Sequence, residues 1–178
     1  MGAAMAFATK PKVSTGTAST ARTNAGPRAV HKDATESSLQ DLGPDQRRLI
    51  RRMNEELPRA LKEMKTHGKK ITHWAWWAFP TELEGESERY PPTCVTKATA
   101  ADLIANAPLI WKETLECVCK CVQNGEDKSV EKNGEETLPS AKDRGRVRYF
   151  VRFWSEVQDK PFWLENVIIE LREAYGSA

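Results

Sequence analysis

Residues 69–80 read Lys-Lys-Ile-Thr-His-Trp-Ala-Trp-Trp-Ala-Phe-Pro and form the most distinctive stretch of the chain. Exposing its four aromatic rings is costly, because each buries about 150–250 Å² when it packs. One interpretation is that the stretch fills the centre of a small core, with His73 bonded to a backbone carbonyl. The other is a pocket in which the aromatic wall stacks on a flat ring, His73 transfers a proton and Lys69 or Lys70 neutralises an anion. The spacing alone leaves both open.

The segments on either side of this stretch have the periodicity of amphipathic helices. From Ile50 to Met64, apolar residues recur at three- and four-residue steps, and Pro58 among them predicts a kink or a junction of two helices. Gly68 is a predicted helix stop. Four further helices are expected. One begins at Thr99 as N-cap, the next has Pro108 in its first turn, the third follows Asp143 or Gly145, and the last starts with Asp159 and Pro161 and ends at Gly176.

The pattern indicates an all-α fold. No alternating run of β-branched residues is present, and the one strand-like stretch, 91–95, is short. We therefore expect one compact multihelical domain over residues 43–178. Within it, the polar residues 123–142, with two glycines and a proline, predict an exposed loop or insertion.

Residues 1–42 differ from the rest in composition. All six tryptophans lie between Trp74 and Trp163, and the first 42 residues are rich in Ala, Ser and Thr, which predicts a disordered tail. Residues 1–32 contain no acidic residue, as is typical of an organelle transit segment. The expected location is cytoplasmic, or organellar if residues 1–32 act as a transit peptide. No run of about 18 apolar residues is present, so no membrane-spanning segment is predicted.

The distribution of charged residues along the chain indicates which class of partner the domain can bind. The first 42 residues carry five basic and three acidic residues, and the other 136 carry 22 of each, so the domain is neutral. A duplex-binding surface needs a basic excess to displace counterions. Nucleic acid is therefore disfavoured as a partner, whereas a small nucleotide is not.

Residues 143–148, Asp-Arg-Gly-Arg-Val-Arg, are a second candidate for function. If a helix begins here, its first amides together with Arg144, Arg146 and Arg148 are suited to holding a phosphate. The alternative is a solvated helix start with balanced charge.

Three of the four cysteines cluster at Cys117, Cys119 and Cys121. On a helix, Cys117 and Cys121 share a face, as in the beginning of a metal site. However, no CxxC pair exists, and further ligands would have to come from Cys94 or a histidine. Free thiols in a reducing compartment are therefore favoured, and neither a metal nor a cofactor is predicted.

The chain contains no motif that identifies a reaction: no phosphate loop, GxGxxG, GxSxG or HExxH. Two functions remain. The first is a domain that binds a small anionic or nucleotide-like ligand where the two motifs meet, with or without catalysing a reaction on it. Its expected lining is Lys69, His73, Trp74, Trp76, Asp143 and Arg146. The second is a non-catalytic protein-interaction subunit or adaptor, for which an exposed tryptophan patch is expected.

Residues 46–176 resemble the largely bacterial family known as domain of unknown function 1810, some members of which are labelled calpastatin. The resemblance is carried mainly by one ordered set of residues: Ala60, Leu61, Glu63, Met64, Gly68, Lys69, Lys70, His73, Trp74, Trp76, Trp77, Phe79 and Pro80. Weaker similarity continues at Ser87 and Tyr90, over 100–109, and over 143–154. The resemblance implies a compact all-helical domain and no established activity.

The chain also departs from that family's pattern. Thr81 stands where the family usually has Gln, and a Ser-x-Met-Thr stretch is replaced by Tyr149, Phe150, Val151 and Arg152. A polar site built on that glutamine and those hydroxyls would be altered in this chain.

Overall fold

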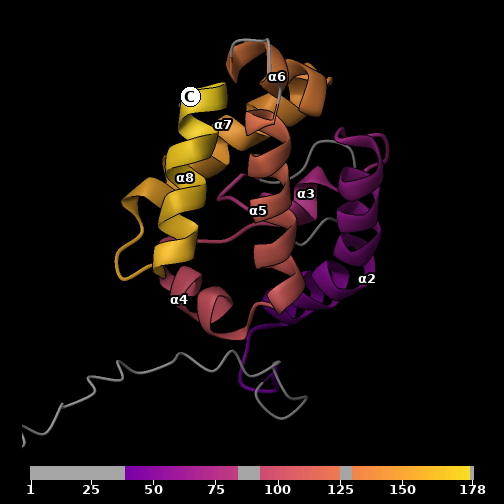
Figure 1. The fold of residues 1–178 in the computed structure, drawn as a ribbon. Coiled ribbons are helices and arrows are strands. Elements are labelled where there is room, and N and C mark those ends of the chain that lie inside the picture. The colour runs from indigo at the N-terminus through magenta and orange to yellow at the C-terminus, as the bar shows by residue number, and fades with distance from the viewer. Residues whose placement is uncertain (1–38, 84–92, 125–129, 177–178) are drawn as a thin grey trace, which may run out of the picture. The chain divides into compact units, whose positions relative to one another are not determined.

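A central helix, α5, organises the described part of the chain. The computed structural model describes residues 39–83, 93–124 and 130–176. These ranges contain seven helices: α2 (Pro44–His67), α3 (Ala75–Ala78), α4 (Lys97–Asn106), α5 (Leu109–Gln123), α6 (Val130–Thr137), α7 (Ala141–Glu156) and α8 (Phe162–Tyr175). Helix α5 packs against α2, α6 and α8, and Figure 1 shows it between α2 and α8. The predicted all-α fold is confirmed, because the described residues form helices and one isolated bridge, Thr81 with Cys94, but no strand.

The folded unit starts earlier than predicted. The chain divides into Met1–Val30, which lies outside the described residues, and His31–Ala178, which holds every described helix. Most of the expected tail, 1–42, is likewise outside the described residues. Its last residues are not a tail, because Leu42 is buried and Leu39 packs against the core. These two apolar side chains extend the domain N-terminally beyond residue 43.

Helix α2 buries the apolar stripe expected from its sequence. It continues through Pro58 as one helix, and Figure 1 shows it bending between its N-terminal and C-terminal parts. A bend is expected where proline removes a backbone donor and crowds the preceding turn. Gly68 ends the helix as predicted: its φ is 65°, a left-handed conformation that glycine adopts without strain, and its N–H donates to Met64 O at 2.8 Å.

Two helix starts differ from the prediction by a few residues. The N-cap of α4 is Thr96, whereas Thr99 is the third helical residue and its hydroxyl accepts from Thr96 N at 3.0 Å. Thr99 thus completes a capping box instead of capping the helix itself. Helix α7 begins at Ala141 after the N-cap Ser140, whose hydroxyl accepts from Asp143 N. Pro108 was expected in the first turn of its helix but is the N-cap of α5, which begins one residue later at Leu109. The end of α8 at Gly176 is as predicted.

The expected insertion over 123–142 is largely part of the fold. Residues 125–129 lie outside the described residues, but α6 occupies 130–137 and Leu138 is fully buried. Tyr175 Oη donates to Gly134 O at 3.0 Å, which fastens α6 to the end of α8. The prediction of an exposed loop was wrong for residues 134–138, because Gly134 contacts α8 and Leu138 is buried in the core.

The described helices include none with the length and apolar character needed to cross a bilayer.

Candidate functional site

The aromatic stretch lies in the core. Trp74 and Trp76 are 1% and 9% exposed, and Trp77 is buried beside them. The short helix α3 presents carbonyls to indoles from other helices, so that Trp111 Nε1 donates to Ala78 O at 2.8 Å. Trp154 Nε1 makes the equivalent bond to Pro80 O at 2.8 Å. This geometry supports the core interpretation, because rings buried to this extent offer little surface to a stacked ligand.

Glu63 fixes the entry into this stretch. Its carboxylate accepts hydrogen bonds from Ile71 N at 2.6 Å, from Thr72 N at 3.1 Å and from Trp74 Nε1 at 2.8 Å. The Thr72 hydroxyl donates to the other carboxylate oxygen at 2.6 Å. Burial raises the pKa of Glu63, but the bonds from Ile71, Thr72 and Trp74 together outweigh it, so the net pKa lies below its usual value. Glu63 is thus a structural anion that orients the turn after α2.

Arg146 joins the second motif to the first. Its guanidinium is almost fully buried, donates through Nε to Phe79 O at 2.8 Å and lies over the Trp76 ring at 5.1 Å. It also donates to Leu83 O and, at 3.5 Å, to Thr93 O. Burial lowers the pKa of Arg146 to about 10, which still leaves it charged at neutral pH. The guanidinium N–H groups donate to backbone carbonyls of other segments. The role of Arg146 is therefore to connect these segments and not to bind an anion.

Asp143 and Lys70 make the other contact between the motifs. Lys70 Nζ lies 2.7 Å from Asp143 Oδ2, and the Lys70 N–H donates to Thr137 O at 2.8 Å. The lysine also lies 5.8 Å from the centroid of the Trp74 ring. The structure therefore brings Trp74, Trp76, Asp143 and Arg146 together, as a packed junction.

The two remaining predicted site residues lie apart from this junction. His73 is exposed at the surface. Lys69 is exposed as well, and it lines a pocket that none of the other predicted site residues lines.

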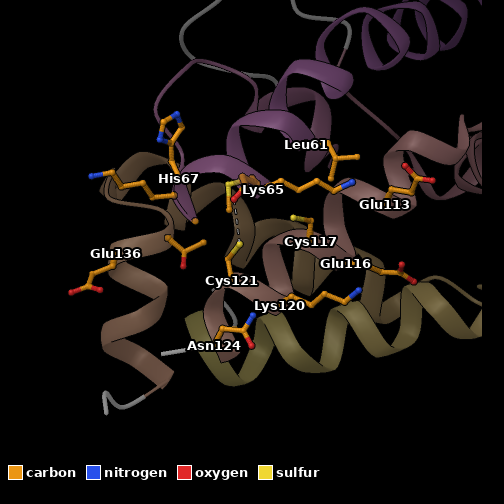
Figure 2. Close-up of a pocket in the computed structure, with 14 residues that line it drawn as sticks. Leu61, Lys65, His67, Glu113, Glu116, Cys117, Lys120, Cys121, Asn124 and Glu136 are labelled. Carbon is orange, nitrogen blue, oxygen red and sulfur yellow. Dashed lines mark hydrogen bonds between the residues drawn. The ribbon is translucent and has the colours of Figure 1, made fainter. Parts of the chain in front are cut away.

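That pocket has a volume of about 760 Å³ and lies between the C-terminal part of α2, the face of α5 and the end of α6 (Figure 2). Its apolar floor includes Leu61 and Met64. The lining is completed by polar and charged residues and two thiols: Lys65, His67, Gly68, Lys69, Glu113, Glu116, Cys117, Lys120, Cys121, Asn124, Glu136 and Thr137.

Some of the charged side chains that line this pocket have a partner in the protein, and others have no ion pair with a described residue. Glu116 pairs with Lys112 at 3.7 Å, and Glu136 is also engaged with the protein. By contrast, Lys65, Lys69 and Lys120 form no ion pair with any residue that the structure describes. The unpaired groups are therefore mainly cationic, with Glu113 as the acidic exception.

The cysteines of α5 face two sides. Cys119 is buried toward α8, and burial raises its pKa, assisted by the charge and hydrogen bond of Glu170. Cys117 and Cys121 face the α2 side, where the Cys121 thiol donates to Met64 O at 3.7 Å. Burial, followed by the neighbouring Cys117, raises the pKa of Cys121 to about 11. Among the described residues, no three His, Cys, Asp or Glu side chains group in a way that suits a metal ion.

Sequence reasoning missed most of this pocket. A weak signal exists, because Glu113, Cys117, Cys121 and Asn124 recur at helical spacing beside the apolar stripe of α5. Their pairing with the end of α2 depends on how the two helices pack, which no local pattern reports.

Scans against protein-family models, curated proteins and solved structures each found no match to this chain.

Proposed function

We propose that this domain binds a small anionic ligand in the pocket between α2, α5 and α6. The observation that carries the proposal is the group of three lysines, Lys65, Lys69 and Lys120, that line one pocket without an acidic partner among the described residues. Unpaired cations around a concavity attract anions and strengthen hydrogen bonds to carboxylate or phosphate.

This proposal keeps the ligand class expected from the sequence and changes its location. Lys69 is the one predicted site residue that lines the pocket. The ligand class narrows as well, since the lining contains no tryptophan and so favours a compact phosphate or carboxylate over a stacked nucleotide base. Membership of the domain of unknown function 1810 family remains part of the proposal.

The protein-interaction alternative receives less support. It is motivated by the absence of a catalytic motif and by the tail and the insertion, and an exposed tryptophan patch would have supported it. However, five of the six tryptophans are buried and Trp163 is half-buried. We therefore place the anion-binding function first.

A thermal-shift titration tests the proposal. The full chain is mixed with inorganic phosphate, pyrophosphate, sugar phosphates and dicarboxylates, and a ligand at 100 times its Kd is expected to stabilise by about 2.7 kcal/mol, or roughly 5–10 °C in Tm. Lys69→Ala and Lys65→Ala should reduce that shift without lowering the Tm of the free protein.

Lys62→Ala is the matched control, because Lys62 is exposed on the same helix but does not line the pocket. The proposal fails if none of these anions raises the Tm, or if Lys62→Ala weakens binding as much as Lys69→Ala.

A further inference from the structure

The two thiols in the pocket lie side by side on one helix. Cys117 and Cys121 are one turn apart on α5, both are half-buried and both are free. Figure 2 shows them in the space between α2 and α5. They interact with each other, and Cys121 also donates to Met64 O at 3.7 Å. The structure therefore presents an accessible dithiol.

Helix geometry decides what this dithiol can form. Side chains four residues apart on a helix have Cβ atoms about 5–6 Å apart. A disulfide requires a Cβ separation of about 3.8 Å, so closing one between Cys117 and Cys121 would distort α5. A metal ion about 2.3 Å from each sulfur spans a separation of about 4.6 Å between the sulfurs. An intact α5 thus suits an ion between the two sulfurs better than a disulfide.

We propose that Cys117 and Cys121 bind one soft monovalent metal ion, Cu(I) being the physiological candidate, as a two-coordinate bis-thiolate. Soft thiolate ligands favour Cu(I) over hard cations. On binding, each S–H bond is replaced by an S–Cu bond and two protons leave to solvent. The copper stays Cu(I), so no oxidant or reductant takes part, and the site carries one net negative charge.

The surroundings favour a two-coordinate ion over zinc. Zinc needs three or four ligands, and the described residues provide no group of three His, Cys, Asp or Glu. Cys119 faces α8, and Cys94 does not line the pocket. Lys65 and Lys120 line the same pocket and offset the negative charge of the complex.

A competition titration with the full chain tests this site. Cu(I) is supplied anaerobically with a chromogenic Cu(I) chelator to a Cys94→Ser variant, which removes the exposed thiol outside the pocket. One equivalent of Cu(I) is expected to transfer to the protein. Adding Cys117→Ser or Cys121→Ser should weaken that binding by at least about 100-fold, as expected for loss of a direct ligand. Retention of Cu(I) by both variants, or no transfer to the parent, would overturn the proposal.

A second measurement uses the unsubstituted protein and does not depend on the folding of variants. Bound Cu(I) is expected to protect Cys117 and Cys121, but not Cys94, from alkylation as read by mass spectrometry. Equal alkylation of Cys117 and Cys121 with and without Cu(I) would contradict the site. Lys69→Ala should leave Cu(I) binding within about threefold, which separates this inference from the anion-binding proposal.

Discussion

Lys70 Nζ lies 2.7 Å from Asp143 Oδ2, and the side chains are only 8% and 12% exposed, so this ion pair fastens the turn after α2 to the first turn of α7. Asp143→Ala is expected to destabilise the protein by about 3–5 kcal/mol, because it leaves a buried ammonium without its partner. The double change Lys70→Met with Asp143→Leu should cost less than Asp143→Ala, since no charge is then left unpaired. Urea unfolding followed by far-UV circular dichroism measures both.

The control for that prediction is the ion pair of Lys97 with Glu156. Its side chains are 66% and 57% exposed, so solvent screens the pair and Glu156→Ala should cost much less stability than Asp143→Ala. A cost for Asp143→Ala no larger than that for Glu156→Ala would show that the buried pair is not a structural fastening.

Glu63 makes the stability of the turn after α2 depend on pH. Burial raises the pKa of Glu63, but the hydrogen bonds from Ile71, Thr72 and Trp74 together lower it by more than burial raises it. The pKa of Glu63 in the folded protein is therefore below its value in the unfolded chain. Its stabilisation is therefore present above the unfolded pKa, about 4.3, and is lost as the pH falls through the folded pKa. Glu63→Gln should cost about 1–3 kcal/mol at pH 7 and flatten this acid dependence.

The measurement is urea unfolding of wild type and Glu63→Gln at several pH values between 3 and 7. Equal loss of stability with falling pH in both proteins would assign the acid sensitivity to other carboxylates.

Two helical glycines should respond to alanine with opposite signs. A Cβ on Gly134 of α6 would lie 3.0 Å from Tyr175 Cε1 and 3.2 Å from Ala174 O, so Gly134→Ala overpacks the contact with α8. We expect a loss of about 1–3 kcal/mol. A Cβ on Gly145 of α7 meets open space, so Gly145→Ala should stabilise by about 0.5–1 kcal/mol through its higher helix propensity.

Thermal unfolding of the two variants checks this pair. Stabilisation by Gly134→Ala would mean that α6 does not pack closely on Tyr175.

The four thiols should react with maleimide in a fixed order. Cys94 is exposed, whereas burial raises the pKa of Cys119 and leaves it as an unreactive thiol. We expect native labelling first at Cys94, then at the half-buried Cys117 and Cys121, and at Cys119 only after denaturation. Peptide mass spectrometry over time identifies each site, and native labelling of Cys119 alongside Cys94 would contradict the packing of α5 on α8.

The sequence predicted those features that depend on local chemistry. Apolar spacing identified α2, α5 and α8, and Gly68 and Gly176 marked two helix ends, because helical periodicity and the conformational freedom of glycine act within a few residues. It also singled out the aromatic stretch, but it left open whether those rings were core or site. Burial depends on what lies opposite a side chain, which is not encoded in its neighbours.

By itself, then, the sequence determined that the chain is all-α. For the aromatic stretch it left two interpretations, of which a buried core was one. The tertiary structure alone decided that Arg146 binds backbone carbonyls, that Gly134 seats α6 on α8, and that the open pocket is lined by Lys69 but not His73. Each of these depends on contacts between residues far apart in the chain. Such contacts form when helices pack, and the local helix propensity of a segment does not predict them.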